Sequence, residues 1–314
     1  MELIRGAHNL RPRHRGCVAT IGNFDGVHLG HQAVLGQLAE RGAALGLPTT
    51  VISFEPLPHE FFGKDKSPAR LSRLRDKLQA LRRFSVDRVL LLRFDRRLAQ
   101  MPAEDFIRDI LVEGLGIRYL VVGDDFRFGA GRKGDFALLS EHGRREGFQV
   151  THMHTFHVDG SRVSSTRIRE ALERGDMDEA AKLLGRNCSF FGRVLHGDKL
   201  GRTLGFPTAN IRVGHQPLPV RGVFTVEVFG HETEPLRGVA NVGVRPTVDG
   251  LRNRLEVHLF DFDGDLYGRH LHVDLLHRLR EERRFESLDA LREQIGRDIV
   301  AARAWFDRLD HEDD

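Results

Sequence analysis

The stretch IGNFDGVHLGH, residues 21–31, decides how the first half of this chain folds. Before it, the apolar run CVATIG at 17–22 is typical of a buried strand, and after it an amphipathic pattern over residues 31–45 indicates a helix. Glycine recurs every four residues in the connection, as expected where backbone must pass close to a ligand. The stretch therefore predicts a strand, a phosphate-binding loop and a helix, in that order.

Outward from this stretch, apolar runs alternate with amphipathic segments through the first half of the chain. After a short N-terminal strand and loop, strands are expected at residues 17–22, 49–54, 87–93, 118–123 and 148–153. Helices are expected over residues 31–45, 70–84, 103–115, 136–146, 165–174 and 176–184. This alternation predicts an α/β fold, a doubly wound parallel sheet covered on both faces, which binds ligands at the carboxyl ends of its strands.

The second half has a different sequence pattern, because glycines and prolines separate short runs of alternating polar and apolar residues. These runs lie at residues 190–197, 222–230, 237–243, 254–262 and 269–276, and they predict a small antiparallel β-barrel. A C-terminal helix is expected over residues 287–309, with Ser287 as its N-cap. Its predicted buried stripe is Leu288, Leu291, Ile295, Ile299 and Trp305. We therefore expect two domains, residues 1–184 and 185–314.

Composition narrows the class of protein. The chain has 314 residues, 40% hydrophobic and 30% charged, and no apolar run long enough to cross a membrane. Its formal charge of +3 comes from dispersed arginines, which does not indicate a nucleic-acid partner. The two cysteines, without an N-terminal secretory signal, predict a cytoplasmic location. Whether the chain forms a weak homo-oligomer stays open.

Two histidines mark the first candidate site. His28 and His31 are three residues apart at the start of the expected helix, so both rings can project to one side, beside unpaired amides at the positive end of the helix. Such a group of donors suits the charge that develops on an α-phosphate and its leaving pyrophosphate. The alternative is a pair of capping or surface histidines, since the chain has 17.

The segment GRTLGFPTAN, residues 201–210, marks a second candidate site. Thr208 and Asn210 are two apart in an extended segment and point the same way, and their oxygens suit Mg²⁺ held jointly with ATP phosphates. Farther on, Glu256 alternates with apolar neighbours, so it is expected on the face of a strand opposite to Leu255 and Val257. The alternatives are a tight turn at 201–210 and a solvent-facing strand glutamate.

These segments carry a resemblance to a known family. The HxGH segment resembles the nucleotidyltransferase superfamily, and the fuller string is similar to the adenylyltransferase module of bacterial bifunctional riboflavin kinase/FAD synthetases. The resemblance continues in SFEPLPHEFF at 53–62, PARLS at 68–72, GDDFRFGAGRKGD at 123–135 and SSTRIREAL at 164–172. In the second half, GRTLGFPTAN resembles the riboflavin kinase signature, with further matches at 222–228, 241–248 and 265–268.

The resemblance implies two successive reactions, with riboflavin, FMN, FAD and ATP as partners and Mg²⁺ as the metal. The carboxyl domain would phosphorylate riboflavin to FMN with ATP, and the amino domain would adenylate FMN with a second ATP, releasing FAD and pyrophosphate.

It also implies residue roles. Catalysis would fall to His28, His31 and Glu256, and Mg²⁺ binding to Thr208 and Asn210. The residues implied for ATP binding are Gly22, Asn23, Phe24, Asp25, Gly26, Gly30, Asp125, Ser164, Ser165, Thr166, Arg167, Arg169, Gly201, Arg202, Gly205 and Pro207. Phe54, Phe126 and Phe128 lie near enough to the strand ends to contact a flavin in the amino domain, although core packing would explain each of them as well.

The chain departs from the family pattern at two positions. Leu57 stands where the family usually has histidine, with His59 two residues later, and Phe224 stands where many members have tyrosine. Two other functions are weighed against the bifunctional one. A single-activity HxGH adenylyltransferase leaves residues 187–314 without a purpose. A flavin-binding regulator with one inactive site requires a damaged catalytic position, yet the candidate catalytic and metal-binding residues are all present.

Overall fold

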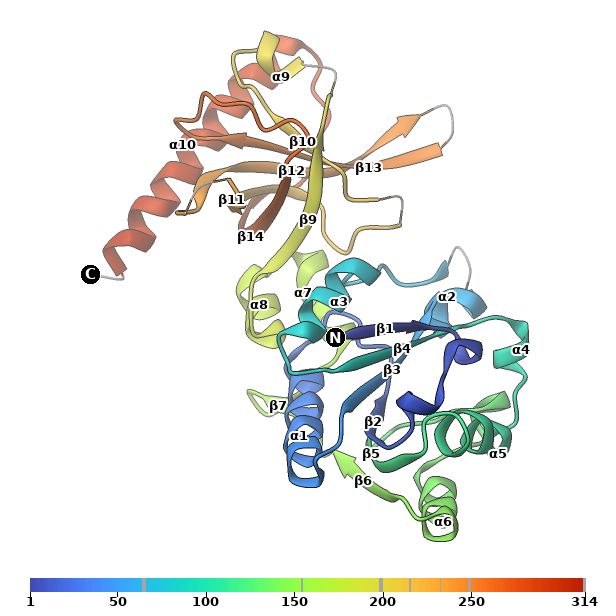
Figure 1. The fold of residues 1–314 in the computed structure, drawn as a ribbon. Coiled ribbons are helices and arrows are strands. Elements are labelled where there is room, and N and C mark those ends of the chain that lie inside the picture. Colours follow the sequence, from blue (N-terminus) through green and yellow to red (C-terminus); the bar gives the residue numbers. More distant parts are fainter. Residues whose placement is uncertain are drawn as a thin grey trace. The chain divides into compact units, whose positions relative to one another are not determined.

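The computed structural model describes residues 1–63, 66–153, 155–197, 200–214, 216–231, 233–247 and 250–312. The chain divides into two compact units. The first comprises Met1–Pro68 and Ser72–Ser165, and the second comprises Ala69–Leu71 and Thr166–Asp314. Figure 1 shows a sheet flanked by helices in the first unit and a barrel with a long C-terminal helix in the second.

The sheet of the first unit has six parallel strands, as the doubly wound prediction requires. They are β1 (Glu2–Arg5), β2 (Cys17–Ile21), β3 (Thr49–Glu55), β4 (Arg88–Arg93), β5 (Ile117–Gly123) and β6 (Gln149–Met153). Their order is β1-β4-β3-β2-β5-β6, so the chain leaves β2 toward one edge and later continues through β5 toward the other. The strand order therefore reverses between β2 and β5, and ligands of such sheets bind at the carboxyl ends on either side of that point.

Helices cover both faces of this sheet (Figure 1). They are α1 (Leu29–Leu45), α2 (Pro58–Gly63), α3 (Leu74–Arg82), α4 (Arg96–Ala99), α5 (Ala103–Phe106) and α6 (Phe136–Glu146). Short connections are η1 (Ala7–Asn9), η2 (Pro12–His14), η5 (Ala130–Arg132) and the hairpin β7 (His157–Val158) with β8 (Ser161–Arg162). Along β2, Val18 packs in the core that holds Leu35 and Leu38 of α1, whereas Cys17 and Ala19 pack in the opposite core. This alternation confirms the doubly wound arrangement.

Two predicted helices differ from the observed ones. The helix expected over 70–84 begins only at Leu74, because Ser72 is buried and its backbone N–H donates to Asp25 Oδ1 at 3.1 Å instead of joining the helix. The helix expected over 103–115 is α5 followed by a π-helical turn, η4 (Ile107–Val112).

The second unit contains the predicted antiparallel barrel. Its elements are α7 (Ser165–Arg174, whose first residue belongs to the first unit), α8 (Met177–Leu184), β9 (Cys188–Leu195), α9 (Leu200–Thr203), β10 (Ala209–Ile211), β11 (Gly222–Phe229), β12 (Leu236–Thr247), β13 (Gly250–Leu259), β14 (His270–Arg280) and α10 (Leu288–Glu312). The barrel closes in the order β10-β13-β12-β11-β14-β9. The strand β10 has three residues, too few to show an alternating pattern, and was not among the predicted runs.

The C-terminal helix packs on the barrel with most of the predicted stripe, since Leu291, Ile295, Ile299 and Trp305 are partly buried there and only Leu288 is not. Ser287 Oγ accepts the N–H of Ala290, which confirms the cap. However, Leu288 is 57% exposed because the first turn of α10 precedes the buried part of the helix. The apolar positions that are fully buried, Ala302 and Phe306, lie farther along and were not predicted. Although α10 has 25 residues, no helix in the described ranges is both long and apolar enough to span a bilayer.

Both cysteines are buried and unpaired. Burial raises the pKa of the Cys17 thiol and raises that of Cys188 to about 12, so both stay protonated at pH 8. We therefore expect a thiol-specific chromogenic reagent at pH 8 to label neither cysteine in the folded protein and both after unfolding in guanidinium chloride. Rapid labelling of a thiol under native conditions would contradict the observed burial.

Candidate active sites

A cavity of about 400 Å³ lies at the carboxyl ends of β2 and β5, where the strand order reverses. It brings together residues that are more than a hundred positions apart in the sequence. The predicted residues that line it are Gly22, Asn23, Phe24, His28, Gly30, His31, Asp125, Phe126, Ser164 and Ser165. The location is the one expected for a nucleotide in a doubly wound sheet.

The loop between β2 and α1 is held in an unusual conformation. Phe24 and Val27 have positive φ angles of 49° and 44°, which L-residues rarely adopt, least of all a β-branched one. Hydrogen bonds from other segments secure this backbone: Gly26 N–H donates to Ser72 Oγ at 3.0 Å, and Ser165 Oγ donates to the Asp25 carbonyl at 3.0 Å. The predicted Asp25 and Gly26 therefore shape the loop from its buried side.

The two histidines of the motif lie against each other at the start of α1. Their rings stack with centroids 3.7 Å apart, and His28 Nδ1 accepts the backbone N–H of His31 at 3.3 Å as the N-cap of the helix. Because Nδ1 accepts, neutral His28 carries its proton on Nε2.

His31 has a more enclosed environment. Burial, with the electrostatic effects of nearby His28 and Lys77, holds the pKa of His31 well below its usual value, so the ring is neutral at pH 7. Its Nδ1 is buried with no hydrogen-bond partner among the described residues. Because His31 also lines the cavity at the helix N-terminus, such an orphaned polar atom fits a phosphate oxygen.

The aromatic residues predicted for flavin binding take three different places. Phe126 lines the cavity and stacks on Phe128, with centroids 5.5 Å apart. Phe128 itself is buried in the core beside Phe106. Phe54, at the end of β3, meets Phe94 edge to face at 5.7 Å.

A neighbouring aromatic residue was missed at the sequence level. The ring of Phe62 on α2 is 68% exposed, yet it packs edge to face against Phe61 and Phe94 at centroid distances of 5.2 and 5.8 Å. Its signal was the double phenylalanine in SFEPLPHEFF, where two successive rings on a short helix cannot both face the core.

The segment after Ser165 contributes to the second compact unit. This unit takes up the chain again at Thr166. The guanidinium of Arg167 pairs with Glu179, and Arg169 Nε donates to the Ala69 carbonyl at 2.6 Å. Of the residues predicted to bind ATP here, Ser164 and Ser165 line the cavity, whereas Thr166, Arg167 and Arg169 are not among its lining residues.

The departure at Leu57 has a structural reason. Its side chain is fully buried, so it packs where the family usually has an imidazole. Its backbone N–H donates to Glu60 Oε2 at 2.9 Å, which fixes the start of α2.

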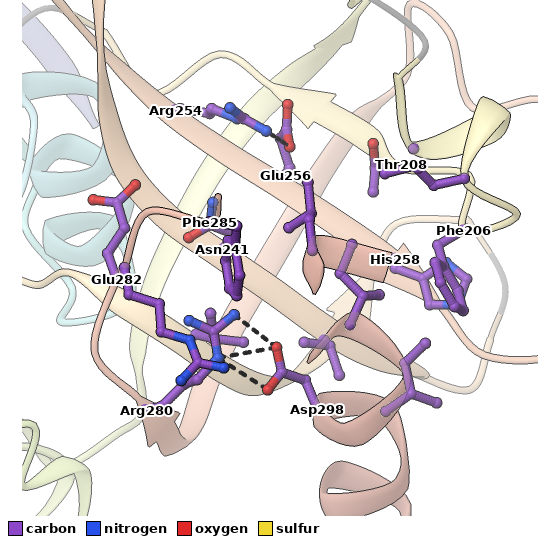
Figure 2. Close-up of a pocket in the computed structure, with 18 of the residues that line it drawn as sticks. Phe206, Thr208, Asn241, Arg254, Glu256, His258, Arg280, Glu282, Phe285 and Asp298 are labelled. Carbon is purple, nitrogen blue, oxygen red and sulfur yellow. Dashed lines mark hydrogen bonds and ion pairs between the residues drawn. The ribbon is translucent and has the colours of Figure 1, made fainter. Parts of the chain in front are cut away.

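A second cavity, of about 380 Å³, lies between the barrel and α10 (Figure 2). Four predicted residues line it: Gly201, Thr208, Asn210 and Glu256. The side chain of Glu256 projects into it, whereas its strand neighbours Leu255 and Val257 are buried on the other face of β13, as the alternation predicted. We call this cavity the helix-side cleft.

The polar wall of the helix-side cleft follows one register row of the barrel. Across five adjacent strands, the directly paired residues are Asn210, Glu256, Asn241, Val223 and Arg280, and all five line the cleft. Paired residues in antiparallel strands point to the same face, so hydrogen-bond register alone gathers these side chains.

Polar atoms without partners remain in this wall. The guanidinium of Arg254 pairs with the Glu256 carboxylate (Figure 2), but its Nε is buried without a partner among the described residues. The Oδ1 of Asn241 is likewise buried and unpaired in that part of the chain. Both can bind polar groups of a ligand.

The facing wall is apolar and comes from α10 and the segment before it, with Phe285, Leu291, Ile295 and Ile299. An ion pair closes one end, where Arg280 Nη2 donates to Asp298 Oδ2 at 2.8 Å (Figure 2). One polar and one apolar wall suit a ligand with a flat apolar ring and a hydroxylated chain.

A third cavity, of about 620 Å³, shares Thr208 with the helix-side cleft. We call it the nucleotide-side cavity. The predicted Arg202 and Pro207 line it, together with Tyr267, whose ring stacks on His196 with centroids 3.9 Å apart. Two neighbouring glycines allow the loop to fold: Gly205 has φ of +88°, and a Cβ on Gly201 would lie 2.4 Å from the Phe206 carbonyl oxygen.

Comparison with known proteins finds a different family in each half of the chain. The FAD synthetase family model matches residues 10–167, and the riboflavin kinase family model matches residues 184–306. A bifunctional riboflavin kinase/FMN adenylyltransferase from Escherichia coli K12 is 54% identical over 307 residues, covering 98% of each chain. The chain belongs to this bifunctional family.

Other relatives of the family extend the similarity. The bifunctional riboflavin kinase/FMN adenylyltransferase of Pseudomonas fluorescens is 53% identical, covering 97% of each chain. A crystal structure described as a macrolide-efflux protein from Streptococcus pneumoniae is 30% identical, with a TM-score of 0.83, over 97% of this chain and all of that one. Membership in the bifunctional family confirms the resemblance drawn from the sequence motifs and disfavours the single-activity and regulatory alternatives.

Proposed function

We propose that the chain phosphorylates riboflavin with ATP in the barrel and then adenylates the FMN product with a second ATP at the β2–β5 edge of the sheet. The observation that carries this proposal is the presence of a separate cavity system in each matched region, each lined by the residues of its own motif. We further propose domain limits of 1–184 and 185–314.

For the kinase step, riboflavin would occupy the helix-side cleft and ATP the nucleotide-side cavity. The isoalloxazine ring would pack on the apolar wall, and the ribityl chain would run along the register row toward Glu256. Glu256 would accept the proton of the terminal hydroxyl as its oxygen attacks the γ-phosphorus and ADP leaves. Arg254 would orient the carboxylate, and Thr208, which lines both cavities, marks where the two substrates meet.

Thr208 and Asn210 would hold Mg²⁺ together with ATP phosphates. Their surroundings fit this role, since a Cβ on Gly197 would lie 2.9 Å from Asn210 Oδ1 and one on Gly201 would lie 3.1 Å from Thr208 Oγ1. Glycine at both positions therefore leaves these oxygens accessible. When bound, the metal supplies neutralisation of phosphate charge.

For the adenylyl step, a phosphate oxygen of FMN would attack the α-phosphorus of ATP, and pyrophosphate would leave. No protein nucleophile is needed, because FMN itself supplies the attacking oxygen. His28 Nε2–H, the ring of His31 and the free amides of α1 would stabilise the charge that develops on the phosphates. We propose that two aromatic rings face the flavin. One is Phe126, and the other is the exposed ring of Phe62 on α2.

We also propose that the protein is cytoplasmic. Two unpaired, buried cysteines support a cytoplasmic location, where thiols stay reduced.

The proposal is tested by giving the full chain riboflavin, ATP and Mg²⁺ and following the flavins by chromatography. We expect FMN to appear first and FAD to follow, with pyrophosphate released in equal amount to FAD. Chelation of Mg²⁺ with EDTA should stop FMN formation. FAD that appears without detectable FMN, even at the earliest times and at high dilution of the enzyme, would contradict the proposed order of the two reactions.

A further inference from the structure

Lys77 is the most deeply buried cation among the described residues, at 1% exposure. It lies on α3, outside every motif used above, and its Nζ donates to the carbonyl oxygen of Asn23 at 2.7 Å. Asn23 is an exposed residue of the β2–α1 loop and lines the cavity at the carboxyl ends of β2 and β5. A fully buried ammonium group therefore anchors the backbone of the loop from behind.

A lysine at this place in the fold is unusual. Burying an ammonium group is costly unless its interactions compensate, and lysine is almost never fully buried for packing. Lys77 also lies four positions after the N-cap Arg73 of α3, near the helix end that disfavours cations.

The conformation of the β2–α1 loop suggests a function for the charge of Lys77. Its backbone is strained at Phe24 and Val27, so it needs anchors on the buried side. Ser53 Oγ also approaches the Asn23 carbonyl, at 3.4 Å, and supplies a weaker, neutral contact to the same atom. The charge of Lys77 reaches the reacting groups, because it contributes to the lowered pKa of His31. The same positive potential attracts a triphosphate.

We propose that Lys77 is a positioning residue of the adenylyl transfer: it holds the Asn23 carbonyl, and with it the phosphate loop, and its buried charge stabilises the developing pyrophosphate from behind that loop. This inference rests on the proposed adenylyltransferase activity of the first unit. It differs from a structural role in one respect, since it requires the charge as well as the hydrogen bond.

Three variants of the full chain separate charge from hydrogen bonding. Lys77→Met removes both, Lys77→Gln keeps an N–H donor without charge, and Lys77→Arg keeps charge and donors. With FMN and ATP supplied, we expect kcat for FAD formation to fall about 100-fold in the Met and Gln variants, with KM for FMN within about threefold of wild type. The Arg variant should retain more activity than Gln, although its side chain is larger.

Two controls accompany these variants. Lys182→Met, at an exposed position on α8, measures the general effect of losing a lysine. Kinase activity and thermal unfolding, measured on every variant, show whether the chain is folded. Wild-type chain that makes no FAD would refute the proposed function itself. Wild-type activity with a Gln variant inside threefold of it, or losses that follow a lowered melting temperature in all three variants, would overturn the role of Lys77 alone.

Discussion

Glu256→Gln is expected to lower the rate of FMN formation from riboflavin by about 1000-fold while leaving FAD formation from supplied FMN unchanged. The substitution keeps the shape of the side chain but removes the carboxylate that would take the hydroxyl proton. The rest of the helix-side cleft persists, because Glu256 is held there by the strand pairing of β13 with β10 and β12. We therefore expect kcat to fall while KM for riboflavin changes little.

The measurement is a steady-state assay of each half-reaction by chromatography of the flavins. Glu227→Gln is a matched control, since Glu227 lies on β11 of the same barrel, two strands away from β13, half-buried and paired with Arg237. It should keep full kinase activity. Glu256→Gln with more than a tenth of the wild-type kcat would show that another group accepts the proton.

His28→Asn is expected to lower FAD formation from FMN by at least about 100-fold. Asparagine is a good N-cap, so it can still accept the His31 N–H and preserve the start of α1, while the imidazole proposed to stabilise the phosphates is lost. With riboflavin as substrate, the variant should convert it to FMN and stop there, because the kinase residues belong to the other unit.

Accumulation of FMN and the absence of pyrophosphate release are the readouts. His8→Asn, an exposed histidine of the same unit, is the control and should make FAD at the wild-type rate. FAD formation by His28→Asn within tenfold of wild type would remove His28 from the chemistry and leave it a role as a helix cap.

The sequence was informative where local pattern determines structure. The loop at 21–31 joins β2 to α1 as its glycines and flanking periodicity predicted, and the alternation around Glu256 correctly separated cleft from core. These features depend on neighbours in the chain, so a period of two or of 3.6 residues is enough to place them.

What the sequence did not provide depends on contacts between distant segments. Asn241 and Arg280 join Glu256 only through strand register, and Lys77 reaches Asn23 across 54 positions. Phe126 and Phe128 look equivalent in the sequence, yet one lines a cavity and the other is buried in the core, because the turn after β5 directs them differently. In α10, Leu288 is exposed and Ala302 and Phe306 are buried for a similar reason, since the barrel, and not the helix, decides where coverage begins and ends.

The register row across the barrel has a consequence for how the kinase site can fail. Side chains alternate between the two faces of a strand, so sliding β13 by one residue would turn Glu256 into the barrel interior and bring Leu255 or Val257 out. The same ladder also aligns Asn210 and Asn241 with the carboxylate. The main-chain hydrogen bonds therefore set the spacing of the three side chains in the proposed kinase site, and the site forms as a whole when the barrel closes.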